Sequence, residues 1–291
     1  IFLEGAGNPV SFKALWDMNE NEYIRKFTDL AIYAKDHGLW VKACPWDSFR
    51  APLDTLKHFA ESLVNEAHVD VFSISDTFNQ TLPWAVTYVI KELKKVTKDT
   101  PIEMHCHNDF GLATANMLAA VIGGASGVDT AINCCGERAG NASTEEVVMA
   151  LELLLGVPTG IKLEKLWELS QLVQELTKLK VAPNKPIVGD ALFTYQSGMV
   201  IWMIEKLKKA GKETACLPFK PELIGRPPYK YVFTKTSGRT LTTIMLRDLG
   251  IEATQEQIDK ITEKAKNESM IRKSYVPDYV FRQIVREVTG K

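Results

Sequence analysis

The sequence predicts an α/β protein built around a parallel sheet, and a (β/α)8 barrel is the favoured architecture. Strand-like apolar runs alternate with helical patterns through the first half of the chain. Four of these runs begin at residues 40, 71, 102 and 130, a spacing that fits one strand–helix–strand step. An open doubly wound sheet would show the same alternation. Polar residues directly follow several of the strands, however, and a barrel builds its active site from several strand ends at once.

Each element is expected from a local pattern. Runs that are apolar on both faces are predicted to be strands, at 1–4, 40–44, 71–75, 102–106 and 130–133. Helical periodicity predicts helices at 19–36, 51–67, 83–96 and 113–125. Asn19 and Glu22 resemble a capping pair, and Pro83 suits a first helical turn. The first of these helices is predicted to place one apolar stripe toward the core, made of Tyr23, Phe27, Leu30 and Ala31.

The composition changes near residue 160, where loops that contain Pro and Gly begin to separate the helical stretches. These stretches lie at 163–179, 199–210, 240–249, 254–267 and 276–288. We therefore divide the chain into the C-terminal part of a TIM barrel at 1–160 and helical C-terminal subdomains at 161–291. The chain opens on Ile1 inside a strand-like run, so we expect the N-terminal strands of the barrel to be missing from this sequence.

The overall composition is that of a globular protein without a strongly charged surface. The 291 residues carry a net charge of -1 and are 45% hydrophobic, which argues against wholesale binding to nucleic acid or to an anionic membrane. No apolar run reaches the roughly 18 residues that a membrane-spanning helix needs. The five cysteines lack CxxC spacing, which indicates a reduced compartment, and we expect a cytoplasmic protein.

The strongest local motif is MHCHND at 104–109. Residues i and i+2 of a strand point to the same face, so His105 and His107 should project together and can chelate one divalent cation. A pair of buried or capping histidines would give the same pattern. The neighbouring Asn108 and Asp109 can either orient these two rings or cap the helix that follows.

A second motif, CCGERAGNAS at 134–143, follows the next predicted strand. Its glycines allow backbone turns that other residues disfavour. Asn141 can offer an amide oxygen to a hard cation, or it can serve a turn before the next helix. Glu137 and Arg138 can pair with each other and shape the loop.

Two further residues are candidates for binding substrate at the strand ends. The hydroxyl of Thr77 follows the strand at 71–75 and can bond a carboxylate, with capping of the next helix as the alternative. Arg50 can bind an anion, although an ion pair with Asp47 or Asp54 would use the same guanidinium.

Three stretches together resemble one enzyme family, and they read HCHNDFGLATANMLAAV, GERAGNASTEEVVMAL and SDTFNQTLP. The family comprises 2-isopropylmalate synthase and the related homocitrate and citramalate synthases. The resemblance implies an HMG-CoA-lyase-like, metal-dependent barrel that condenses acetyl-CoA or another acyl-CoA with a 2-oxo acid. It implies that His105, His107 and Asn141 lie at a divalent cation, with zinc, manganese, magnesium and iron as candidates. It also implies that Thr77 contacts the carboxylate of the 2-oxo acid and that the enzyme is a homodimer.

Two positions depart from the pattern of this family. Trp46 stands where a glutamate is usual, and Val200 stands where the family has a histidine linked with catalysis. The acid–base set of the family's first strand has no counterpart in this sequence, so no catalytic acid or base is assigned. A carbon–carbon lyase or aldolase of the same barrel group, and a catalytically impaired paralogue, are therefore alternatives. The departures predict that 2-oxoisovalerate is not the preferred 2-oxo acid.

Overall fold

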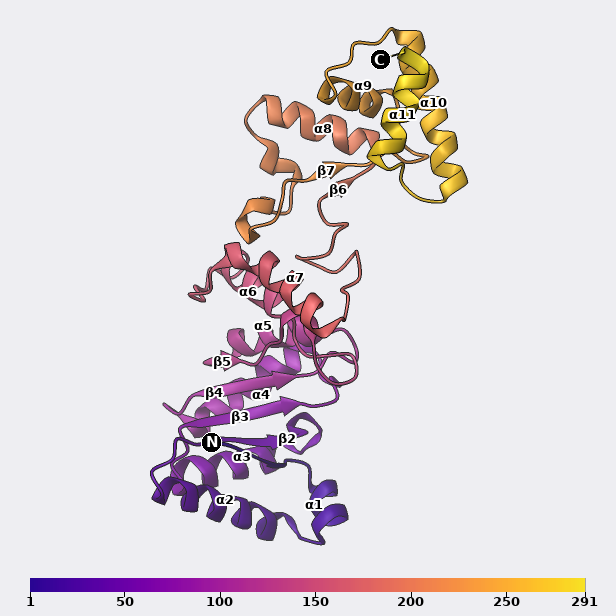
Figure 1. The fold of residues 1–291 in the computed structure, drawn as a ribbon. Coiled ribbons are helices and arrows are strands. Elements are labelled where there is room, and N and C mark those ends of the chain that lie inside the picture. The colour runs from indigo at the N-terminus through magenta and orange to yellow at the C-terminus, as the bar shows by residue number, and fades with distance from the viewer. Residues whose placement is uncertain (291) are drawn as a thin grey trace. The chain divides into compact units, whose positions relative to one another are not determined.

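The computed structural model describes residues 1–290, which form two compact units (Figure 1). The first unit comprises Ile1–Ile161, and the second begins at Lys162. Each unit has a hydrophobic core of its own. No helix among residues 1–290 is both long and apolar enough to cross a membrane.

The first unit is built on a five-stranded parallel sheet in which the strands follow their order in the chain (Figure 1). The strands are β1 Phe2–Ala6, β2 Lys42–Trp46, β3 Val71–Asp76, β4 Ile102–Cys106 and β5 Gly127–Val128. Each connection advances by one strand, which is the order of a (β/α)8 barrel. The predicted parallel α/β architecture is confirmed. All five carboxyl ends meet at one edge of the sheet, where the polar motifs lie.

The helices of the first unit follow the strands and pack into one core with them. They are α1 Pro9–Trp16, α2 Glu20–Asp36, α3 Leu53–Glu61, α4 Pro83–Thr97, α5 Ala113–Gly123 and α6 Thr144–Leu153. The predicted capping box of α2 is confirmed, because Asn19 and Glu22 exchange hydrogen bonds of 2.9 and 3.0 Å. Pro83 occupies the first turn of α4 as predicted. α3 runs on into a π-helical turn, Ser62–Glu66.

The last strand of the sheet is shorter than predicted and lies earlier in the chain. The prediction of a strand at 130–133 was wrong, because β5 covers only Gly127–Val128 and Ile132–Cys134 forms a 3-10 turn. Asn133 has a φ of 58°, a left-handed conformation that interrupts an extended chain. Ala131 makes a single bridge to Ser143, so this segment belongs to the loop at the sheet edge.

Two other details also differ from the prediction. Leu30 was expected in the buried stripe of α2, but it is 51% exposed, so the stripe is narrower than the sequence suggested. α1 was not predicted, although Asn8 caps it by accepting a hydrogen bond from Val10 N and Pro9 follows in its first turn.

The second unit is mainly helical, as predicted, and its helices from residue 198 onward surround a core that includes Phe233 and Phe281. The helices are α7 Leu166–Thr177, α8 Gly198–Lys209, α9 Arg239–Asp248, α10 Gln255–Arg272 and α11 Asp278–Thr289. Short 3-10 turns cover Leu163–Lys165, Glu213–Cys216 and Pro221–Ile224. A two-stranded parallel sheet, β6 Thr194–Tyr195 with β7 Lys230–Tyr231, was not predicted, because two-residue strands leave no alternation to detect.

Candidate metal and substrate site

The end of β4 brings the two predicted histidines together. The ring centroids of His105 and His107 lie 5.0 Å apart, with an angle of 77° between the ring planes. His105 is the fourth residue of β4, and His107 lies two positions after His105, directly after the strand. Strand alternation therefore places both imidazoles on one side of the sheet, at its carboxyl edge.

The loop after β5 brings Asn141 to the same place. His107 and Asn141 form an antiparallel bridge, and Asn108 N donates to Gly140 O at 2.9 Å. Asn141 Oδ1 and His107 Nδ1 are buried, and neither atom has a hydrogen-bond partner among residues 1–290. A buried polar atom without a partner is costly, and a bound ion is one of the ordinary ways to satisfy it.

Burial lowers the pKa of His107, and the positive charges of Arg138 and His105 act in the same direction. A lowered pKa favours the neutral imidazole, which is the form that binds metals. No group of three His, Cys, Asp or Glu side chains suited to a metal lies within the described chain. Two imidazoles and one amide oxygen thus make a fitting but partial ligand set, and zinc, manganese, iron and magnesium suit such donors to different degrees.

Asp129 lies beside His105 and was not identified from the sequence. His105 Nδ1 is 3.6 Å from Asp129 Oδ2, while the two oxygens of Asp129 accept hydrogen bonds of 3.0 and 3.2 Å from Lys42 Nζ. Lys42 also contacts Glu103 Oε2 at 2.6 Å. Burial raises the pKa of Asp129, but the hydrogen bonds from His105 and Lys42 outweigh it and leave the pKa below its ordinary value. No sequence signal pointed to this residue, because the strand was predicted at 130–133 and Asp129 directly follows β5 only in the structure.

Two glycines give the loop 134–143 its conformation. Gly140 has a φ of 87°, and a Cβ atom at this position would lie 1.7 Å from Cys134 O. A Cβ atom at Gly136 would lie 2.5 Å from Asn141 Oδ1. Any side chain at Gly136 would therefore displace the amide of Asn141, so this glycine leaves space for the candidate ligand.

Thr77 follows β3 and is held by two neighbouring loops. Its Oγ1 accepts a hydrogen bond of 2.8 Å from Asp47 N, and its carbonyl oxygen accepts one from the guanidinium of Arg138. Arg50 forms two hydrogen bonds of 2.7 Å with the carboxylate of Asp47, which is the ion pair considered as its alternative role. Direct binding of substrate by Arg50 stays a prediction.

The residues after His107 have partners other than the histidine rings. Asn108 Oδ1 accepts a hydrogen bond of 3.1 Å from Ala113 N, at the start of α5. Asp109 pairs with Arg138 at 2.9 and 3.0 Å, and hydrogen bonding by Arg138 lowers its pKa. Both residues thus support the loops, and Asp129 is the carboxylate that faces His105.

The two positions that depart from the family pattern lie in different units. Trp46 ends β2 with a half-buried side chain at the carboxyl edge of the sheet. Val200 lies in the first turn of α8 in the second unit and is also half-buried.

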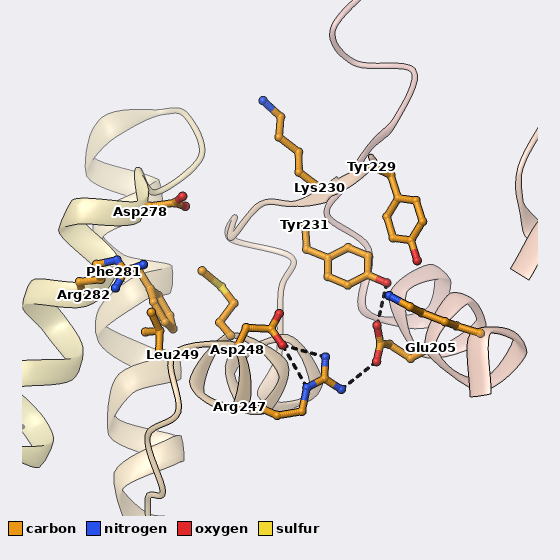
Figure 2. Close-up of a pocket in the computed structure, with 12 residues that line it drawn as sticks. Glu205, Tyr229, Lys230, Tyr231, Arg247, Asp248, Leu249, Asp278, Phe281 and Arg282 are labelled. Atoms are coloured by element: carbon orange, nitrogen blue, oxygen red, sulfur yellow. Dashed lines mark hydrogen bonds and ion pairs between the residues drawn. The ribbon is translucent and has the colours of Figure 1, made fainter. Parts of the chain in front are cut away.

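The second unit contains a cavity of its own, of about 370 Å³, between β7 and helices α8, α9 and α11 (Figure 2). Arg247 bridges Glu205 and Asp248 on its wall, with a distance of 2.9 Å to each carboxylate. Tyr231 donates a hydrogen bond of 3.1 Å to Glu205. The guanidinium of Arg247 is thus engaged by two carboxylates, and the strand ends of the first unit offer the stronger candidate site.

The sequential parallel strands and the polar loops at their carboxyl ends define the first unit as part of a (β/α)8 barrel. The chain belongs to the HMGL-like family, whose model matches residues 5–173. Solved structures agree on the fold: an HMG-CoA lyase from Bacillus subtilis is 23% identical and matches 63% of this chain and 64% of its own with a TM-score of 0.53.

Curated relatives are synthases by name. An (R)-citramalate synthase from Methanocaldococcus jannaschii is 38% identical over 98% of this chain and 56% of its own length. A 2-isopropylmalate synthase from the same organism is 39% identical over 98% of this chain and 54% of its own. A homocitrate synthase from Methanothermobacter thermautotrophicus is 37% identical over 89% of this chain and 64% of its own length. The chain thus spans little more than half the length of the first two.

Proposed function

We propose that this chain carries the metal site and the 2-oxo-acid site of an acyltransferase that condenses acetyl-CoA with a 2-oxo acid. The observation that carries the proposal is the pair of buried atoms without partners, His107 Nδ1 and Asn141 Oδ1, beside the ring of His105. The names of the curated relatives support the same class of reaction.

His105, His107 and Asn141 would hold a divalent cation, and such a cation supplies Lewis-acid polarisation of a keto oxygen when it is bound. Asp129 orients the ring of His105 from behind, as carboxylates do for metal-bound histidines. Thr77 can donate its hydroxyl hydrogen to the carboxylate of the 2-oxo acid, because Oγ1 is the acceptor in its hydrogen bond with Asp47 N.

Proton transfer from acetyl-CoA requires a side chain of suitable pKa. The indole of Trp46 offers only an N–H donor and the side chain of Val200 offers no titratable group, so neither performs this transfer. The residues named above therefore bind the cation and orient the 2-oxo acid, and another group transfers the proton.

The test uses the complete protein after removal of metal by a chelator. Titration with zinc, manganese or magnesium should show one divalent ion bound per chain, and His107→Ala or Asn141→Ala should weaken that binding strongly. His58→Ala is the matched control, because His58 is a half-exposed histidine that pairs with Glu20 away from the strand ends. Release of free CoA from acetyl-CoA should require both the metal and a 2-oxo acid. Unchanged metal binding by the His107→Ala protein would contradict the proposal, and cleavage of a hydroxyacyl-CoA without condensation would favour a lyase.

A further inference from the structure

Two arginines face the same phenyl ring at the carboxyl edge of the sheet. The guanidinium carbon of Arg50 lies 4.1 Å from the centroid of the Phe78 ring, and that of Arg138 lies 5.3 Å from it. Each arginine also forms a two-point ion pair, Arg50 with Asp47 and Arg138 with Asp109. Loops that follow four different strands thus meet around one aromatic side chain.

Thr77 is tied to both of these ion pairs. The backbone N–H of Asp47 donates to Thr77 Oγ1 at 2.8 Å, and a guanidinium nitrogen of Arg138 donates to the carbonyl oxygen of Thr77. One loop therefore fixes the hydroxyl and another fixes the main chain of the same residue. Within residues 1–290 no group accepts a hydrogen bond from the hydroxyl of Thr77, so this hydroxyl can donate to a ligand.

The two ion pairs differ in how deeply they are buried. The side chain of Asp47 is 2% exposed, so removal of Arg50 would leave its buried carboxylate with the amide of Asn8 as its side-chain partner and would threaten the fold. The pair of Arg138 and Asp109 is 37% and 23% exposed, and exposed pairs contribute little to folding stability. Arg138 can therefore be replaced while the fold remains intact, and its role in the site can be tested.

We propose that Arg138 and Phe78 are positioning residues for the 2-oxo acid, which act by holding Thr77 where its hydroxyl meets the substrate carboxylate. The inference rests on the proposed function, since it needs Thr77 to contact that carboxylate. Arg138 acts through Thr77, because its Nε and NH2 atoms bond Asp109 and the Thr77 carbonyl. Its remaining nitrogen, NH1, faces Glu137 Oε2 at 3.8 Å. Phe78 fills the space between the two guanidiniums and limits their movement.

The experiment measures binding of pyruvate, 2-oxoisovalerate and 2-oxoglutarate to the complete protein loaded with metal, together with KM and kcat for each substrate. Arg138→Gln should weaken binding of the preferred 2-oxo acid by about tenfold, the loss that corresponds to about 1.4 kcal/mol. The KM for acetyl-CoA and the Tm should stay near those of the parent protein. Phe78→Leu should produce a smaller change of the same kind.

The matched control is Arg25→Gln, because Arg25 is an exposed arginine in α2 that pairs with Asp29 and Glu66. Thr77→Val removes the hydroxyl itself, and the double variant with Arg138→Gln should bind no more weakly than Thr77→Val alone, since both changes remove one contact. Additive losses in the double variant, or 2-oxo-acid binding by Arg138→Gln equal to that of the control, would overturn the positioning role. If Thr77→Val leaves the binding of all three 2-oxo acids unchanged, the proposed substrate site is wrong and the positioning role falls with it.

Discussion

Asp129 Oδ2 lies 3.6 Å from His105 Nδ1, and the same carboxylate accepts two hydrogen bonds from Lys42 Nζ. Asp129, in the segment after β5, therefore links Lys42 of β2 with His105 of β4, a candidate metal ligand. A ring nitrogen that faces a carboxylate leaves the other ring nitrogen oriented toward the metal side. Removing the carboxylate should therefore affect the metal more than the fold.

Asp129→Asn is predicted to weaken the affinity for a divalent cation by about 10- to 100-fold, the usual cost of losing such an orienting partner. Competition of the protein with a chromogenic chelator would measure this affinity. Asp29→Asn is the control, because Asp29 pairs with Arg25 on the exposed surface of α2. A metal affinity equal to that of the control would show that Asp129 does not orient His105.

Gly136→Ala is predicted to reduce metal affinity, because the new Cβ atom would lie 2.5 Å from Asn141 Oδ1 and push the amide out of place. Overpacking of this kind costs about 1–3 kcal/mol. Gly198→Ala makes the same chemical change where no atom lies within 4 Å of the added Cβ, so it should bind metal normally. Equal metal affinities for the two variants would show that a Cβ atom at position 136 does not displace the amide of Asn141.

Asp70 is predicted to make the stability of the first unit depend on pH. Asp70 Oδ2 accepts hydrogen bonds of 2.7 Å from Lys35 Nζ and Val41 N, which tie α2 to the start of β2. Burial raises the pKa of Asp70, but these bonds outweigh it, so the folded pKa lies below the ordinary value of 3.8. A depressed carboxyl pKa adds stability above that value, and this stability is lost as the pH falls through the folded pKa.

Asp70→Asn should therefore lower the Tm at pH 7, and the difference from the parent protein should shrink as the pH is taken below 3.8. Thermal unfolding at a series of pH values measures both effects. The exposed pair of Arg25 and Asp29 supplies the comparison, since Asp29→Asn should change the Tm little at any pH. A Tm difference that grows at low pH would contradict the assignment.

Phe59→Ala is predicted to destabilise the first unit by about 3–5 kcal/mol, because it removes a fully buried ring and leaves a cavity. The ring contacts Phe12 and Phe27 edge-on, with centroids 6.0 Å apart in each case. Phe110→Ala should cost little, since Phe110 is 66% exposed. Urea unfolding followed by circular dichroism would compare the two, and similar midpoints would show that the site repacks around the lost ring.

The substrate is predicted to be a 2-oxo acid other than 2-oxoisovalerate. Trp46 adds a large half-buried indole at the carboxyl end of β2, where it can reshape the acid pocket. The identities of 38% and 39% to a citramalate and a 2-isopropylmalate synthase do not separate the two substrates. Release of CoA from acetyl-CoA with each 2-oxo acid would decide, and robust turnover with 2-oxoisovalerate as the best substrate would refute this prediction.

The sequence by itself determined the elements whose signals are local. The capping box of Asn19 and Glu22 and the start of α4 at Pro83 each depend on residues within one helical turn. The strand β3 is buried throughout and β4 alternates buried with half-buried residues, so the positions of both could be read from short-range patterns. Strand spacing likewise predicted that His105 and His107 would lie together, and their rings are 5.0 Å apart.

Only the tertiary structure decided how the loops meet. Asp129 bonds Lys42 from 87 positions away, and Arg138 bonds the carbonyl of Thr77 from 61 positions away. Periodicity reports which face of a strand is buried, but it carries no information about which charged side chain a distant loop will bring to its end. The predicted strand at 130–133 was wrong in the same region, where Asn133 is left-handed and Ala131 bridges Ser143 of the following loop.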